Sequence, residues 1–526
     1  MIERVIENWL ININERAYQV PFSQLLSLKG YKVLHLSSHG AGEHGKDIIT
    51  FDETGTPCAF QLKTGNVGTS EWRNIAGEIN ELIDLAIVHP SIDTAIKHRA
   101  VLVTNGKLSD DVRAKIVALN ESNARRNVPF LEVIAGKELL SDFIKFQGEF
   151  LPTDPKSIHG FLGLYIYDGK RNLPETDFVD FVVDLLFISG DTPLNAKRRI
   201  AATVLLTKYA LNQFEKESNF AAVIKAWTIL AAYIMAKSER DGLKTEFWQE
   251  SFELCWYEIS RLSQEFKEEI LSRKDYLEGD IIGDGGPVYK TRTTLLMGWL
   301  AANELAQRTK DPTYPFDTRV IETIKKNWSD KLFEYWGESA SSCLFLTGHL
   351  MRINNEVPTA TGMFSFVLGS LAEANSQKSK IEGLPDPYYS AEECLLIYFK
   401  VNEEEVDLKN FIGTSYTLRA FINSLVNLDR RDIIEKHWND LSRIHYCSFM
   451  PDPKWDFYLW RAEGGEERQD SYEMQGSWEK LKELARFDST ATVVPGTLAS
   501  HKYFLPIFLW AYPHRLTPGA ANLCVN

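Results

Sequence analysis

The sequence predicts an α/β domain, with a mixed sheet flanked by helices, over residues 1–150 and a large all-α domain after it. Three observations support this fold class. Two strand-like runs surround a Gly/Pro-containing turn between residues 47 and 64, which predicts a β-hairpin. Strand and helix patterns then alternate to about residue 146. From residue 176 onward, apolar residues recur at helical spacing.

The elements expected in the first 150 residues follow from these patterns. They are, in order, helix 2–29, strands 32–37, 47–52 and 58–64, helix 69–87, strand 100–106, helix 109–123, strand 129–134 and helix 137–146. Thr69 or Ser70 is the expected N-cap of the helix over 69–87, because a hydroxyl side chain can accept from the first free backbone amides.

A linker is expected over residues 151–175, because residues 148–155 are rich in turn formers. The aromatic stretch 161–167 within it is expected to form a strand or to cap the next domain. Residues 176–526 are then a helical regulatory or partner-binding domain, whole or in two subdomains. Because its segments show no fixed repeat period, we expect an irregular helical domain or a solenoid of helical hairpins.

The helical segments expected in this second part share a 3.6-residue apolar period. They cover residues 177–188, 194–214, 219–237, 244–274, 288–308, 317–335, 358–374, 388–400, 407–426, 429–446 and 498–511. The most apolar long run is 220–237, and Lys225 interrupts it, so a buried helix is expected there and not a membrane span.

The hairpin brings three polar residues together. Side chains alternate between the two faces of a strand, so Gln61 and Lys63 share the face opposite Cys58, Phe60 and Leu62. The hairpin can bring Asp47 beside Gln61 and Lys63. A carboxylate and an amide oxygen are hard ligands that suit Mg²⁺. A neighbouring lysine supplies positive charge to an attacking water or to a phosphate in its transition state.

Asp47 followed by Gln-x-Lys at 61–63 on a short hairpin resembles the PD-(D/E)xK nuclease superfamily, and within it the Mrr-like restriction endonucleases. The helix ending at Gly30-Tyr31, the strand after it and the glycine-bearing loop 40–45 resemble the same family. The resemblance implies a restriction-endonuclease-like fold for residues 1–150 and a Mg²⁺-dependent endonuclease acting on DNA, with Mn²⁺ as an alternative ion. Asp47 and Gln61 are then metal ligands, and Lys63 is the catalytic lysine. The helical region resembles no family.

One position departs from the family pattern. The family usually carries a metal-holding glutamate on the opening helix, and that position falls on Gln19 here. Glu15 lies one helical turn earlier on the same face. It either replaces the missing carboxylate as a metal ligand, or the site holds a single, weaker metal.

Four further residues are candidates for substrate binding: His39, His44, Thr64 and Trp72. The histidines, with Glu43, lie in the loop before Asp47 and either touch metal or DNA or are simply solvated. Trp72 near the start of its helix either reaches DNA or packs on the core.

Composition limits the partners. Residues 1–150 carry 16 Lys and Arg against 19 Asp and Glu, which leaves −11 of the total charge of −14 for the rest. Both parts are acidic, so we do not expect the monomer to grip DNA tightly alone. A homo-oligomer or a complex with a separate partner protein is expected. Six scattered cysteines without CxxC spacing, and an N-terminus without a secretion signal, indicate a cytoplasmic protein.

Two functions from different classes follow. The first is a DNA endonuclease whose helical domain controls it, which by family analogy acts in prokaryotic defence against phage or foreign DNA. The second is a catalytically degenerate nuclease fold that serves as a scaffold or nucleic-acid-binding subunit of a larger complex. The low carboxylate count and the acidic charge favour the second, and the set of Asp47, Gln61 and Lys63 favours the first.

Overall fold

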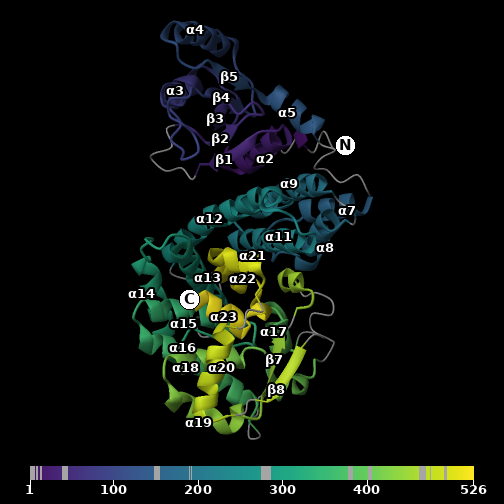
Figure 1. The fold of residues 1–526 in the computed structure, drawn as a ribbon, viewed down its shortest axis with the longest axis vertical. Helices are drawn as coiled ribbons and strands as arrows, with labels where there is room; N and C mark the ends of the chain where they lie inside the picture. The colour runs from purple at the N-terminus through teal and green to yellow at the C-terminus, as the bar shows by residue number, and fades with distance from the viewer. Residues whose placement is uncertain are drawn as a thin grey trace. The chain divides into compact units, whose positions relative to one another are not determined.

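A computed structural model describes most of the chain: residues 6–7, 10–11, 13, 15–37, 45–146, 155–188, 190, 192–273, 286–376, 383–400, 406–449, 451–460, 469–473, 476–490 and 494–525. The chain forms two compact units. The first contains residues 1–223 and 244–257, and the second contains residues 224–243 and 258–526. The first has a mixed five-stranded sheet with helices, and the second is largely helical (Figure 1).

The sheet of the first unit runs in sequence order. Its strands are β1 (Lys32–Leu36), β2 (Ile48–Phe51), β3 (Pro57–Lys63), β4 (Arg99–Thr104) and β5 (Leu131–Ile134). The first three strands pair antiparallel, and the last three pair parallel. The mixed sheet predicted from the sequence is therefore confirmed.

Helices cover both faces of this sheet. Helices α3 (Thr69–Asp84) and α4 (Asp110–Arg126) pack on one face, in a core that includes Ala59 and Leu102. Helix α2 (Glu15–Leu28) packs on the other face, where the rings of Phe22 and Phe60 meet edge to face with centroids 5.6 Å apart. Consecutive strand residues such as Ala59 and Phe60 point to opposite faces, which explains why β3 is buried on both sides.

Helix α5 (Gly136–Lys145) follows β5, and helices α7 (Pro155–Tyr165), α8 (Glu175–Leu186), α9 (Pro193–Ala210) and α10 (Asn212–Lys216) also belong wholly to this unit. Helices α11 (Phe220–Arg240) and α12 (Gln249–Ser272) each contain a boundary between the two units. Within the described residues, α11 is the one helix whose length and composition would allow a membrane crossing. Its most apolar window is 83% buried, as expected for a core helix.

Three local predictions are wrong. The helix expected over 2–29 is interrupted, because Ile13 is not helical and α2 begins at Glu15. The N-cap of α3 is Gly68, whose backbone amide donates to Glu71 Oε2 over 3.2 Å, so the acid three residues on replaces the expected hydroxyl cap. The aromatic stretch 161–167 forms no strand; its first five residues are the end of α7, where Phe161 and Tyr165 stack one helical turn apart and Phe161 also meets Phe181 of α8.

The second unit is built around helices α13 (Pro287–Lys310) and α15 (Ala340–Ile353). They approach closely at Gly298, where a Cβ atom would lie 2.4 Å from the Cβ of Cys343. The surrounding helices are α14 (Thr318–Ser329), α16 (Val357–Ala374), α17 (Ala391–Tyr398), α18 (Leu418–Asn427), α19 (Arg431–Leu441), α20 (Trp478–Thr490), α21 (Gly496–Ser500), α22 (Leu505–Ala511) and α23 (Pro518–Val525).

The prediction that the second part is all-α is wrong in one place. A three-stranded sheet joins β6 (Thr414–Ser415), β7 (His445–Phe449) and β8 (Gln469–Glu473), with β6 parallel and β8 antiparallel to β7. Helix α19 ends at Leu441, and the run expected to stay helical to 446 changes to a strand. A run of five residues with two aromatic side chains is too short for its apolar period to separate strand from helix.

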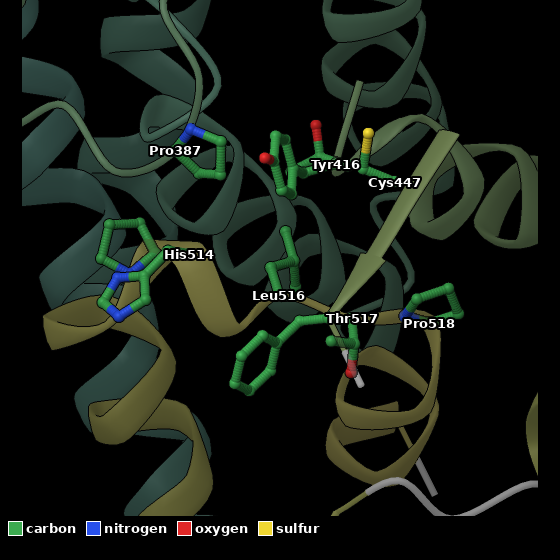
Figure 2. A pocket seen from close by; sticks show the side chains of 10 residues that line it. Pro387, Tyr416, Cys447, His514, Leu516, Thr517 and Pro518 are labelled. Atoms are coloured by element: carbon green, nitrogen blue, oxygen red, sulfur yellow. The ribbon is translucent and has the colours of Figure 1, made fainter. Parts of the chain in front are cut away.

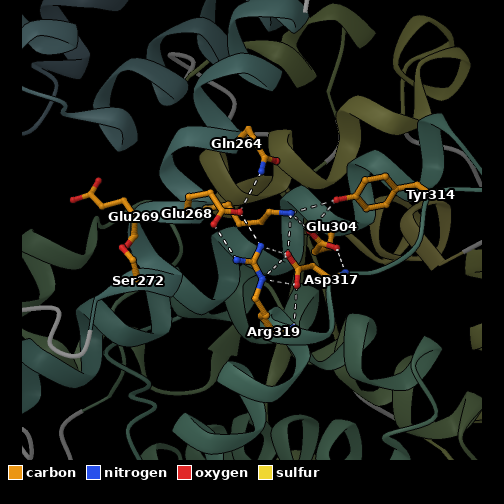
Figure 3. A network of polar contacts seen from close by, with 9 residues as sticks. Gln264, Glu268, Glu269, Ser272, Glu304, Tyr314, Asp317 and Arg319 are labelled. Carbon is orange, nitrogen blue, oxygen red and sulfur yellow. Dashed lines mark hydrogen bonds and ion pairs between the residues drawn. The ribbon is translucent and has the colours of Figure 1, made fainter. Parts of the chain in front are cut away.

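A buried ion network fixes three helices of the second unit to one another (Figure 3). Lys267 Nζ of α12 lies 3.2 Å from Glu304 Oε1 of α13 and 3.5 Å from Asp317 Oδ2, the cap of α14. Both Lys267 and Glu304 are buried. Arg319 closes the network at the surface by pairing with Asp317 and Glu268. Each buried charge has an opposite partner, so the loss of one member would leave an uncompensated buried charge, and the cluster has no group free for chemistry.

Candidate active site

Asp47 is held at the open end of the hairpin by the backbone of β3. Its amide donates to the carbonyl of Phe60 over 2.8 Å, directly before the Ile48–Phe60 pair of the ladder. Its carboxylate oxygen Oδ2 accepts from the amide of Leu62 over 2.6 Å. The carboxylate is therefore locked beside the stretch of β3 that carries Gln61 and Lys63.

Gln19 fixes the other side of Asp47. Its buried amide nitrogen donates to the carbonyl of Asp47 over 2.9 Å and to that of Ser37 over 3.4 Å. The hydroxyl of Tyr257 donates to Gln19 Oε1 over 2.9 Å. A carboxylate at this position has no proton to donate to two carbonyls. The structure thus accounts for glutamine where the family pattern has glutamate: Gln19 positions the aspartate.

Lys63 is held between two carboxylates. Its ammonium lies 3.1 Å from Glu15 Oε1 and 2.9 Å from Glu78 Oε2. Burial alone would lower the pKa of Lys63, but the interactions with Glu78 and Glu15 outweigh it and raise the pKa above its usual value. Lys63 is therefore a fixed positive charge and not a neutral base at physiological pH.

Glu78 of α3 was missed in the sequence, although its spacing carries a signal. It lies three residues after Ile75 and four before Leu82, both buried, so it is an acid on the core-facing side of an amphipathic helix. Gly45 explains how α3 comes so close. Its φ is +67°, and a Cβ atom there would lie 2.6 Å from the carbonyl oxygen of Glu78 and 3.4 Å from Gln61 Oε1.

The carboxyl group of Asp47 is strongly perturbed. Burial raises its pKa to about 7, and the neighbouring carboxylates of Glu15 and Glu78 push in the same direction. The hydrogen bond from Leu62 and the charge of Lys63 oppose this rise without cancelling it. An added cation would relieve both the burial penalty and the repulsion among these acids.

Gln61 supplies a second indication that a cation fits. Its Oε1 is buried and accepts no hydrogen bond from the described residues. Buried carbonyl oxygens are rarely left unpaired, and an amide oxygen is a suitable ligand for a hard divalent ion. Within the described part of the chain, no three His, Cys, Asp or Glu side chains have the arrangement of a metal site. A cation here would therefore depend on Gln61 as well as on Asp47 and either Glu15 or Glu78.

The remaining predicted site residues are placed as follows. Thr64 is exposed just beyond the end of β3, next to Lys63. Trp72 is partly buried and packs against the core under α3, so packing is its observed role. His39, His44 and Glu43 lie outside the described residues.

The second unit offers one other pairing of reactive residue types. Cys447 and His514 both line a cavity of about 10 Å³, and Tyr416 and Thr517 line it too (Figure 2). Burial raises the pKa of the Cys447 thiol to about 11, so the sulfur stays protonated. The cavity has room for one water. This pair therefore does not make a nucleophile.

Comparisons with known proteins assign no family to the chain. No protein-family model matches it, and neither a curated protein nor a solved structure matches it. The class of protein is defined by the fold alone: an α/β unit with a mixed five-stranded sheet, followed by a largely helical unit.

Proposed function

We propose that the first unit is a Mg²⁺-dependent DNA endonuclease of the PD-(D/E)xK type, similar to the Mrr-like enzymes. One observation supports it above the others. Asp47, Gln61 and Lys63 share the end of one hairpin, where Asp47 is buried among carboxylates and Gln61 keeps an unpaired oxygen. Perturbed groups that gather in this way are typical of catalytic sites.

Each side chain has a distinct role in this proposal. Asp47 and Gln61 would hold the ion, together with Glu15 or Glu78. Bound Mg²⁺, or Mn²⁺ in its place, would polarise the phosphodiester and lower the pKa of a water. The ammonium of Lys63 stabilises the negative charge that grows on the phosphate. Gln19 keeps the carboxylate of Asp47 oriented through its backbone.

The largely helical second unit has a regulatory or partner-binding role in this proposal. A nuclease that cut freely in its own cytoplasm would destroy its host, and prokaryotic defence against phage or foreign DNA is a role in which cleavage is triggered. The acidic charge of both parts of the chain favours a homo-oligomer, or a complex with a separate partner protein, as the form that holds DNA.

A plasmid-cleavage assay with Mg²⁺, Mn²⁺ or EDTA tests the proposal. Asp47→Asn keeps an acceptor for Leu62, and Lys63→Met keeps the stem of the lysine, so both variants should fold. We expect each to lose cleavage by about 100-fold or more. Asp111→Asn and Lys107→Met make the same charge changes at exposed positions of the same unit and should keep full activity. Near wild-type cleavage by Asp47→Asn or Lys63→Met would remove the assignment.

A second function has its own support. Lys63 is already engaged by two carboxylates, and no cluster of three acids is arranged for a metal among the described residues. These facts favour a degenerate nuclease fold that acts as a scaffold or nucleic-acid-binding subunit. Wild-type protein that binds labelled duplex in an anisotropy assay, yet cuts neither DNA nor RNA with any divalent ion, would support this alternative over the enzyme.

A further inference from the structure

Among the described residues that line a small recess in the second unit, none is acidic. The recess has a volume of about 20 Å³ and lies among α15, α16, α18 and α23. Its polar lining comes from Arg352 and His349 of α15, Ser424 and Asn427 of α18, and Asn522 of α23. Asn427 is exposed and Arg352 is partly exposed, so the recess meets solvent on their side.

Arg352 lacks a counter-charge within the described parts of the chain. No carboxylate in them lies within ion-pair distance, and its one hydrogen-bond partner there is His349 Nδ1, at 3.4 Å from Nη2. Burial lowers the pKa of Arg352, and no acid offsets that effect. An arginine remains charged nonetheless, because its pKa starts above 12. A half-buried guanidinium without an anion is costly for a protein to keep.

His349 does not share this charge. Burial lowers its pKa to about 3, the positive charge of Arg352 acts in the same direction, and the carbonyl of Cys524 accepts a hydrogen bond from the ring. The imidazole is therefore neutral. Its proton lies on the nitrogen that faces Cys524, which leaves Nδ1 to accept from Arg352. Arg352 is held in place by this contact, and its other donors have no partner among the described residues.

Asn522 adds a second unsatisfied donor. It is 8% exposed, and its amide nitrogen has no partner among the described residues. An unpaired buried amide is uncommon in folded proteins. Asn522 and Arg352 line the same recess, and no acidic side chain is among the described residues that line it.

We infer that this recess binds a small oxyanion, either a phosphate or a carboxylate group, between the guanidinium of Arg352 and the amide of Asn522. The guanidinium supplies parallel donors that match two oxygens of such a group. The volume of about 20 Å³ holds one or two water-sized atoms, since a single water needs about 10–15 Å³ by this measure. It therefore admits oxygens of one oxyanion group whose remainder stays at the solvent edge, and not a whole nucleotide. The site is independent of the proposed nuclease chemistry.

The test is calorimetric titration of the full-length protein, at constant ionic strength, with inorganic phosphate, a nucleoside 5′-monophosphate or acetate. We expect saturable binding of phosphate, of acetate or of both, with a Kd of about 1 mM or tighter. Saturation by acetate as well as phosphate assigns a general oxyanion site, whereas phosphate alone assigns a phosphate site. Binding of the nucleotide alone, or of none, overturns the proposal, because the recess has no room for a base.

Two substitutions locate the site. Arg352→Gln removes the charge, and Asn522→Asp places a carboxylate in the recess as an internal substitute for the anion. Both should lose at least about tenfold in affinity, and Asn522→Asp should keep or raise the Tm, which separates lost binding from lost folding. Arg443→Gln removes the same charge from an exposed position of the same unit and should bind as wild type. Binding that survives both Arg352→Gln and Asn522→Asp lies elsewhere, for example at Lys63, and refutes this assignment.

Discussion

The side-chain amide of Gln19 donates to the backbone carbonyl of Asp47 over 2.9 Å, and this contact holds the backbone of the aspartate in place. Gln19 occupies the position where the family pattern has a glutamate. Because the contact needs a donor, the two residue types are not interchangeable here.

Gln19→Glu should therefore destabilise the protein. The new carboxylate would face the carbonyls of Ser37 and Asp47 without a proton, in a buried position. We expect the free energy of unfolding to fall by about 1–3 kcal/mol, measured by chemical denaturation at neutral pH. A gain of metal-dependent activity at unchanged stability would show that this position can take the family role after all.

Gln61→Glu should keep metal-dependent cleavage, since a carboxylate at this position still ligates Mg²⁺. In the absence of metal it adds a further acid beside Asp47, so the metal-free variant should be less stable than wild type. Thermal unfolding with and without Mg²⁺ would show a larger metal-dependent rise in Tm for the variant. Complete loss of cleavage would mean that the amide of Gln61 has another role. Gln61→Leu, which has neither an amide nor a carboxylate, is the matched comparison for Gln61→Glu.

Glu15 remains a predicted metal ligand. In the structure its carboxylate lies at the site, paired with Lys63, and so does that of Glu78. If Glu15 holds the ion, Glu15→Gln should raise the Mg²⁺ concentration for half-maximal cleavage by about tenfold, while Glu78→Gln should change it less. The reverse order would transfer the role to Glu78.

The raised pKa of Asp47 predicts a pH dependence of stability. In the unfolded chain this carboxyl ionises near 3.8, and in the folded protein near 7. The folded state thus holds the proton of Asp47 more tightly than the unfolded chain does. The stabilisation that this proton gives the folded state is fully present below about pH 4 and is lost as pH rises through about 7. Asp47→Asn should therefore raise the free energy of unfolding by roughly 2–4 kcal/mol at about pH 8 and change it little at about pH 4.

Taking the difference between wild type and Asp47→Asn is essential to that measurement. Glu338 of the second unit is also buried with a pKa raised to about 7, so wild-type stability alone would combine both groups. The difference cancels Glu338, because Asp47→Asn leaves it unchanged. Equal effects of the substitution at both pH values would contradict the perturbed carboxyl.

The network in Figure 3 predicts two very different mutational costs. Glu304→Ala leaves the buried ammonium of Lys267 with Asp317 as its remaining carboxylate partner and should cost about 3–5 kcal/mol of stability. Glu268→Ala removes only an exposed partner of Arg319 and should cost less than about 1 kcal/mol. Similar losses for the two variants, measured by urea unfolding, would contradict the distinction.

The sequence predicts the elements of residues 1–150 well because the strands there are short apolar runs bounded by clear turn signals. The five-stranded mixed sheet is confirmed, and so is the alternation with helices α3, α4 and α5. Helix α15 has no counterpart among the predicted segments, because its sequence carries no clear local pattern. It is buried on all sides from Ala340 to Met351, so it has no apolar stripe for a period to reveal.

Parts of the candidate site depend on tertiary contacts that no local pattern encodes. The hairpin predicts the proximity of Asp47 to Gln61 and Lys63. The engagement of Lys63 by Glu78 depends on how closely α3 crosses Gly45. The role of Gln19 depends on backbone carbonyls of Ser37 and Asp47, which have no sequence signature.

The single hydroxyl proton of Tyr257 is shared between the carbonyl of Ser37, at 2.7 Å, and Gln19 Oε1, at 2.9 Å. Tyr257 is more than 200 residues from both along the chain, yet it belongs to the same compact unit. The contacts of the candidate site therefore extend beyond residue 150, and a gene fusion cut near residue 150 would not transfer them whole. A fragment that ends there would contain Asp47 and Lys63 but would lack Tyr257, whose hydroxyl binds Ser37 and Gln19 beside Asp47.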